Sequence, residues 1–162
     1  MLFKHTTRKG DPVELHLADE TTCHELLDVV NLEREKLRRA CLSAEEMAVM
    51  LRTHNIIYTR VRGQVTGVCI YKPSRPVVVD WLAVAPEYRR HYIAAYLLKS
   101  ISLGLSGRSR PVEVSVPEHA DAMIGLLSHC DLQSRVDSDD PTVYVFAGVP
   151  KYVFSDRSKQ CA

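Results

Sequence analysis

Four polar side chains, those of Arg89, Arg90, His91 and Tyr92, stand between an apolar segment and the start of a helical pattern. The N–H groups in the first turn of a helix carry partial positive charge, so cationic side chains beside them are unfavourable unless an anion lies among them. Guanidinium groups donate charge-assisted hydrogen bonds that suit phosphate oxygens. The residue types therefore predict that an anionic group binds at this junction.

A single carboxylate, Asp80, interrupts the apolar segment Val77–Val84. Because strand side chains alternate, we expect Asp80 on the face of Leu82 and opposite Trp81. An unpartnered buried carboxylate is costly, so Asp80 should lie near the strand end or in a water-filled cleft. Two interpretations stay open: a functional acid at the cleft, or a structural aspartate that pairs with an arginine or caps a turn.

The elements on either side of the junction follow from hydrophobic periodicity. Val77–Val84 is apolar on both faces apart from Asp80, which is typical of a central strand that is covered on both sides. From Arg89 to about Leu103, apolar residues recur at helical spacing. The strand is therefore predicted to lead directly into a helix.

The remaining elements complete a mixed sheet with helices on both faces. Two helices that begin at capping-box pairs follow the first strand, and the second should end near Asn55; the pairs are Thr22 with Glu25 and Ser43 with Glu46. Another helix is expected over 118–130. Strands with alternating patterns or flanking turn residues are expected over 13–18, on both sides of Arg62-Gly63-Gln64, over 111–116, and in "LQSRV" and "TVYVFAG".

Length and composition predict one domain. With 46% hydrophobic side chains in 162 residues, the chain can bury one core. We place the domain at 13–150, between an N-terminal tail, 1–12, and a C-terminal tail, 151–162. No apolar run approaches the roughly 18 residues of a membrane span.

Charge and cysteine usage narrow the classes of partner. The net charge of +1 gives no global bias toward nucleic acid, although the basic stretch Arg34–Arg39 leaves that partner open. Five scattered cysteines without a CxxC pair favour a reducing, cytoplasmic location, and the histidines lack metal-ligand spacing, so no metal site is predicted. Cys69 and Cys130 are expected to be buried apolar residues rather than nucleophiles.

The order of elements, with "LAVAPEYRRHYIAAYLL" at its centre, resembles the GNAT superfamily of acyl-CoA-dependent N-acyltransferases. Members have a strand that ends in L-x-V-x-P-E-Y and a loop of the form [RQ]-x-x-G-x-[GA] that opens a helix. The strand end matches from Leu82 to Tyr88, and Arg89 and Ala94 match the first and last loop positions. The resemblance covers about 13–148 and implies an α/β (α+β) fold with a mostly antiparallel sheet of about seven strands and about four helices.

The resemblance also implies a function and a site. The expected activity is transfer of an acetyl group from acetyl-CoA to a primary amine by direct attack in a ternary complex, with Asp80 taking the amine proton. The coenzyme A pyrophosphate would bind Arg89, Arg90 and the loop amides. The set implied for the cofactor is Leu82, Ala83, Val84, Arg89, Arg90, His91, Tyr92, Ile93 and Ala94. An amine-bearing small molecule or a protein would be the acceptor, and a homodimer through the C-terminal strands is common among members.

Two departures from the family pattern support an alternative. Tyr92 replaces the loop glycine; we expect it in the first helical turn with right-handed dihedrals, so that the glycine of the pattern would matter only for space. The tyrosine that members use to protonate the departing thiolate is replaced by Leu126 or Leu127, although Ser128 or His129 lies nearby. The alternative is a catalytically inactive GNAT-fold module that binds a protein partner or acyl-CoA.

Overall fold

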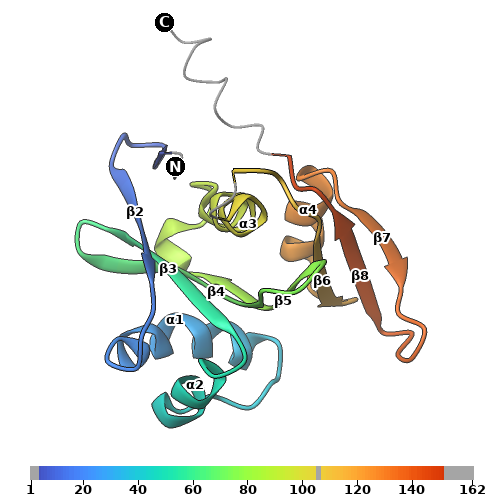
Figure 1. The fold of residues 1–162 in the computed structure, drawn as a ribbon, viewed down its shortest axis with the longest axis horizontal. Helices are drawn as coiled ribbons and strands as arrows, with labels where there is room; N and C mark the ends of the chain where they lie inside the picture. Colours follow the sequence, from blue (N-terminus) through green and yellow to red (C-terminus); the bar gives the residue numbers. More distant parts are fainter. Residues whose placement is uncertain (1–3, 105–106, 152–162) are drawn as a thin grey trace, which may run out of the picture.

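One mixed sheet of eight strands runs through the computed structural model, which describes residues 4–104 and 107–151 (Figure 1). The strands are β1 (His5–Thr6), β2 (Pro12–Leu17), β3 (Asn55–Val61), β4 (Gln64–Lys72), β5 (Val77–Val84), β6 (Val112–Pro117), β7 (Gln133–Val136) and β8 (Val143–Gly148). The helices are α1 (Cys23–Lys36), α2 (Ala44–Met50), α3 (Ile93–Leu103) and α4 (Asp121–His129), with a short 3₁₀ turn over Pro86–Tyr88. The spatial order of strands is β1-β2-β3-β4-β5-β6-β8-β7.

The mostly antiparallel character of the sheet is confirmed. Every neighbouring pair of strands is antiparallel except β5 and β6, which run parallel and are joined through α3. A parallel pair needs a crossover connection, and the helical pattern after residue 89 supplies it. The predicted strand Val77–Val84 has the observed bounds of β5.

The sheet begins earlier than predicted. Within the stretch expected to be a tail, residues 5–6 form β1 and Pro12 begins β2, and His5 is paired with Val13 and buried. A strand of two residues is too short to show a period of two in the sequence, so the pattern gave no signal. Of the predicted C-terminal tail, only Lys151 lies within the described residues.

Helices cover both faces of the sheet, as predicted (Figure 1). On one face, α1 and α2 bury a cluster that includes Leu26, Met47 and Trp81. On the other face, α3 and α4 bury a larger cluster that includes Leu97 and Leu127. The two apolar faces explain why β5, which contributes to both clusters, is apolar almost throughout.

Of the two capping boxes predicted at helix starts, one is present and one is absent, and the second helix ends earlier than predicted. The capping box at Ser43 is present, because its hydroxyl accepts from the N–H of Glu46 and the Glu46 side chain accepts from the N–H of Ser43. Thr22 makes no such bond to α1, since its hydroxyl is engaged with the backbone of Asp19. The helix α2 ends at Met50, before the Asn55 that was expected.

The hairpin between β3 and β4 is the predicted one. Arg62 and Gly63 both have left-handed backbone angles, with φ of 51° and 79°, and Val61 pairs with Gln64. Two central residues with positive φ are what a type I′ turn requires, and this turn matches the twist of the strands.

Candidate active site

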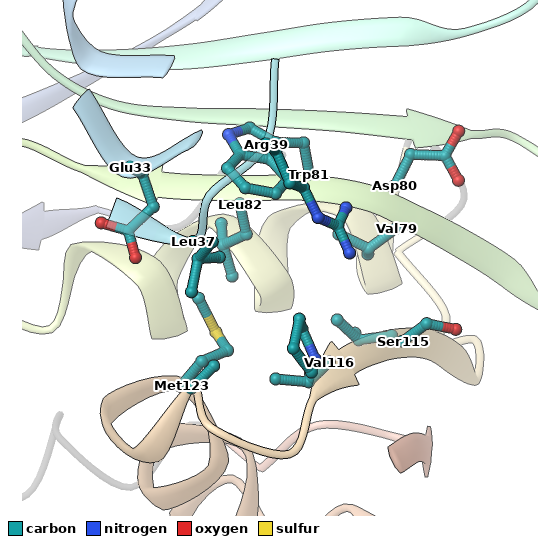
Figure 2. A pocket seen from close by; sticks show the side chains of 13 residues that line it. Glu33, Leu37, Arg39, Val79, Asp80, Trp81, Leu82, Ser115, Val116 and Met123 are labelled. Atoms are coloured by element: carbon teal, nitrogen blue, oxygen red, sulfur yellow. The ribbon is translucent and has the colours of Figure 1, made fainter. Parts of the chain in front are cut away.

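A β-bulge shapes the centre of the site. On β4, Ile70 pairs with Trp81 whereas Tyr71 pairs with Val79, so Asp80 is an extra residue on β5. The extra residue breaks the alternation, and Asp80 and Trp81 lie on the same side of the strand (Figure 2). The prediction that Asp80 shares the face of Leu82 and opposes Trp81 is therefore wrong, because it assumed an unbroken strand.

The partner of Asp80 is a histidine. The Oδ2 atom of Asp80 is hydrogen-bonded to Nε2 of His54, and Nδ1 of His54 lies 2.7 Å from the hydroxyl of Thr53. The His54 side chain is 11% exposed and that of Asp80 is 33% exposed. The carboxylate is thus anchored at one oxygen and still reaches solvent. The sequence shows no signal for this pair, because the fold brings together residues that are 26 positions apart.

Beside Asp80, β5 and β6 separate. Their parallel pairing covers only Val77–Val79 against Val112–Val114, so the stretch from Asp80 to Val84 has no partner strand on its β6 side in the described sheet. Between the diverging strands lies a narrow cavity of about 30 Å³, closed by Met123 of α4 and by Glu33 and Leu37 (Figure 2). Asp80 lines this cavity, with its carboxylate directed away from most of the other lining side chains.

A larger cavity of about 470 Å³ continues from the narrow one toward the start of α3. The two cavities share Glu33, Leu82 and Met123. The larger cavity brings together the residues expected at a cofactor site except His91: Leu82, Ala83, Val84, Arg89, Arg90, Tyr92, Ile93 and Ala94. The two strand ends and the junction loop therefore form one continuous cleft.

The junction loop differs from prediction in its backbone. The helix α3 begins at Ile93 rather than Arg89, and the residues before it alternate in conformation, with Arg90 at φ 66° and Tyr92 at φ 63°. The expectation of right-handed dihedrals at Tyr92 is wrong. Left-handed backbone costs a non-glycine residue about 1–2 kcal/mol. A glycine at position 92 would adopt this conformation without that cost, so Tyr92 departs from the family pattern in backbone strain as well as in size.

The N-terminal segment supports this strained loop. The guanidinium of Arg8 lies over the Tyr92 ring, 4.9 Å from its centre, and donates to the Tyr92 hydroxyl at 2.6 Å. His91 accepts from the N–H of Arg8 at 3.0 Å, and its carbonyl oxygen lies 2.8 Å from Nε2 of His5. His91 is therefore turned toward the N-terminal segment instead of the cavity, and the Tyr92 hydroxyl is held by Arg8.

The two arginines of the loop have different surroundings. Arg89 donates through Nη2 to Oε2 of Glu33 at 3.0 Å, which brings an acid from α1 into the cleft. Arg90 is exposed and makes no ion pair with another described residue. Sequence reasoning missed Glu33, because nothing in the pattern of α1 distinguishes this half-buried acid from the exposed acids of the same helix. No side chain caps the N-terminus of α3, so its first N–H groups are available at the cleft.

Part of the basic stretch Arg34–Arg39 also packs at this site. The guanidinium carbons of Arg34 and Arg39 lie 5.1 Å and 5.4 Å from the centre of the Trp81 ring. Such distances are typical of cation–π contacts. These two arginines are therefore engaged with the sheet, and Arg39 also lines the narrow cavity (Figure 2).

Cys69 and Cys130, and the residues at the position of the family's proton-donating tyrosine, lie either in the core or in the wall of the cleft. Burial raises the pKa of the Cys69 thiol and raises that of Cys130 to about 11, so neither is a ready nucleophile. Leu126 and His129 line the larger cavity, whereas Leu127 is fully buried in the core. Within residues 4–104 and 107–151 no cluster of histidines, cysteines and acids has the arrangement of a metal site.

His5 makes the support of the loop sensitive to pH. Burial lowers the pKa of His5, and the charge of His91 lowers it further. The hydrogen bond of His5 to the His91 backbone raises the pKa, but this effect is smaller than that of burial. The unfolded chain therefore binds a proton at higher pH than the native one, so stability should fall as the pH drops through about 6.5, the ordinary histidine value. We expect the free energy of unfolding in urea to drop less between pH 7.5 and 5.5 in His5→Phe than in the unaltered protein. Equal drops would contradict this prediction.

Comparison with solved structures identifies the architecture. The GNAT domain of Streptomyces lividans PAT superposes with a TM-score of 0.74 at 12% identity, covering 91% of this chain and 96% of that one. A PaiA N-acetyltransferase from Thermoplasma acidophilum, solved with coenzyme A, superposes with a TM-score of 0.67 at 13% identity and covers 86% and 99%. The chain has the GNAT fold. No protein-family model and no curated protein matches its sequence.

A third GNAT-fold neighbour was solved with both an amine and a cofactor. The diaminobutyrate acetyltransferase EctA from Paenibacillus lautus, in complex with L-2,4-diaminobutyric acid and coenzyme A, has a TM-score of 0.65 at 17% identity and covers 88% of this chain and 98% of that one. The two chains thus share the GNAT fold although little of their sequence is the same.

None of the helices in the described ranges has the length and hydropathy that a bilayer crossing would need.

Proposed function

We propose that this protein is an N-acetyltransferase that moves an acetyl group from acetyl-CoA to a primary amine. The observation that carries the proposal is the cleft between the separated ends of β5 and β6, which opens onto the uncapped start of α3 beside Arg89 and Arg90. A GNAT fold with such a cleft has a place for a nucleotide at one end and for a reacting amine at the other.

The residues present fit coenzyme A. Backbone N–H groups of Ile93 and Ala94 at the helix start favour a diphosphate, and the exposed Arg90 adds a charged donor. The free side of β5 from Asp80 to Val84 offers backbone groups to an extended amide-containing arm. The volume of about 470 Å³ lies in the usual range for a ligand site.

The chemistry divides between the cofactor and the chain. Acetyl-CoA supplies the acetyl group as a thioester. A neutral amine is the nucleophile, and Asp80 takes its proton, directly or through water, while His54 holds the carboxylate in place. Backbone groups of Leu82–Val84 orient the thioester and polarise its carbonyl. Because the buried cysteines are poor nucleophiles, transfer is direct, in a ternary complex.

The alternative is an inactive module that binds acyl-CoA or a protein partner. Two observations favour it: Tyr92 occupies a left-handed loop position, and Leu126 lines the cleft where a tyrosine would donate a proton. In the enzyme proposal the departing thiolate either leaves unassisted or takes a proton from His129, which lies in the same wall as Leu126.

One experiment separates the two. The protein is incubated with acetyl-CoA and a panel of small amines, amino acids and peptides, and free thiol is followed, while calorimetry measures coenzyme A binding. Amine-dependent thiol release supports the transferase. Binding without turnover on any acceptor supports the module, and absence of coenzyme A binding removes the transferase proposal.

The proposal extends to the class of acceptor, the assembly and the cellular compartment. An amine-bearing small molecule or a protein amine suits the proposed reaction, a homodimer is the assembly that the resemblance implies, and the cytoplasm suits a chain whose described cysteines are free. The carboxylate of Asp80, which lies at the edge of the narrow cavity and is reached by solvent, is the group that argues for an amine approaching from the solvent side.

Coenzyme A affinity should depend on the Arg89–Glu33 pair. We expect Arg89→Ala to weaken binding about tenfold, or about 1.5 kcal/mol, the lower end for a charged hydrogen bond, because Glu33 already neutralises part of its charge. Glu33→Gln should strengthen binding, since it removes a carboxylate that competes with phosphate for Arg89. Calorimetry measures both, with Arg135→Ala on β7 as an exposed control. If Arg89→Ala and Arg135→Ala bind alike, the loop does not hold the diphosphate.

A further inference from the structure

A third cavity, of about 520 Å³, lies on the α3 side of the sheet and shares no lining residue with the cleft. Its walls come from β2, β3, β4, the C-terminal half of α3 and Arg110. The lining residues are Leu15, His16, Leu17, Asn55, Ile57, Tyr71, Pro73, Ser100, Ile101, Gly104 and Arg110. The proposed acetyltransferase reaction makes no use of this space.

Arg110 is the charged group of this cavity. Its Nε atom is buried without a hydrogen-bond partner, and its Nη2 atom makes one long bond, 3.4 Å, to the carbonyl oxygen of Ile101. No carboxylate stands among the described lining residues, and no described acid forms an ion pair with Arg110. The charge of a guanidinium at the wall of a mostly apolar cavity is costly without a counter-charge, so an anionic group of a ligand would stabilise it.

The backbone beside Arg110 is shaped to admit the guanidinium. A Cβ atom on Gly104 would lie 2.5 Å from Nη2 of Arg110, and Gly104 has φ +52°, ψ −150°. A side chain at this position would both clash and be strained. The guanidinium therefore fills a space that glycine leaves for it at the end of α3.

Polar and apolar groups share the other walls. Burial raises the pKa of Tyr71, which keeps its hydroxyl protonated as a hydrogen-bond donor, and the Tyr71 side chain is bonded to Asn55. Leu15, Ile57 and Ile101 add apolar surface. A few polar groups that converge in a mostly apolar hollow are typical of a small-molecule site.

We propose that this cavity binds a small organic carboxylate with an apolar body, such as a short aliphatic or aromatic acid. The carboxylate pairs with the guanidinium of Arg110, and the apolar body lies against Leu15, Ile57 and Ile101. Binding at this site needs neither acetyl-CoA nor an amine, so it stands apart from the proposed acetyl transfer.

The test compares acids with their neutral amides. Hexanoate, hexanamide, benzoate and benzamide are titrated into the full chain by calorimetry, with and without saturating coenzyme A. We expect at least one acid to bind at least tenfold more tightly than its amide, with an affinity that coenzyme A leaves unchanged. Failure of both acids to bind, equal binding of acid and amide, or displacement by coenzyme A would overturn the proposal.

Variants locate the binding. Arg110→Gln should weaken acid binding at least tenfold, and Arg110→Lys, which keeps the charge but lacks the forked donors, should weaken it several-fold. If the Arg110 variants do not fold, Tyr71→Phe replaces them in the test. This variant keeps the ring, removes the hydroxyl and should also weaken acid binding. Arg135→Gln is the matched control and should bind as the unaltered protein does. Unchanged acid binding in a folded Arg110→Gln, or in Tyr71→Phe where that variant takes its place, would contradict the assignment.

Discussion

Replacing Asp80 with asparagine is expected to lower kcat/KM for the amine about 10²- to 10⁴-fold, the usual contribution of a general base. The substitution keeps the shape of the side chain and a hydrogen-bonding oxygen for His54. It removes the group that takes the proton. Coenzyme A affinity should stay unchanged, because Asp80 does not line the larger cavity. Steady-state kinetics with acetyl-CoA and calorimetry measure the two quantities.

Two further variants distinguish catalysis from a structural role. His54→Gln removes the partner of Asp80 and should lower kcat/KM less than Asp80→Asn does, because the carboxylate remains. Asp139→Asn changes an exposed acid in the turn between β7 and β8 and should leave activity intact. If Asp80→Asn turns over as fast as Asp139→Asn, then Asp80 is a structural residue paired with His54 and the base lies elsewhere.

Gly67→Val should destabilise the fold by about 3 kcal/mol, at the upper end of the usual cost of overpacking a core. Gly67 lies on β4 opposite Val84, and a Cβ there would be 2.8 Å from Ile93 Cγ2, 2.9 Å from Thr59 Oγ1 and 3.0 Å from Leu97 Cδ1. The larger side chain would push α3 away from the sheet at the residue where that helix begins. Urea unfolding measures the loss.

The chain provides a matched glycine for comparison. Gly125 lies exposed within α4, and a Cβ there would meet nothing within 4 Å. Gly125→Ala should stabilise the protein by about 0.5–1 kcal/mol, because alanine has the higher helix propensity. A Gly67→Val variant as stable as the unaltered protein would show that α3 can move without cost. In that case the close contact would not set the position of the junction loop.

Sequence periodicity was sufficient for most of the architecture. The strand Val77–Val84, the capping box at Ser43 and the positive-φ hairpin at Arg62 and Gly63 were all predictable, because each depends on neighbours within a few residues. The two-residue β1 was not predictable, since its partner strand, rather than its own pattern, defines it.

The candidate site was predictable only as a location. The residue types at the junction indicated an anion-binding corner, and all but His91 of those residues line the cleft. Their conformations and partners were missed. Tyr92 was expected in a right-handed helical turn, and neither Glu33 nor His54 was recognised as a partner of a site residue.

The sequence by itself determined most of the segments that become strands and helices, with β1 as the exception, and it determined which strand and helix meet at the cationic corner. Tertiary structure decided the rest: the bulge that turns Asp80 toward His54, the ion pair that ties Arg89 to α1, and the cavity that Arg110 lines. The physical reason is the sequence separation of the residues that interact. Periodicity and capping act between residues a few positions apart, whereas these contacts join residues separated by 26 and 56 positions and depend on how strands and helices pack.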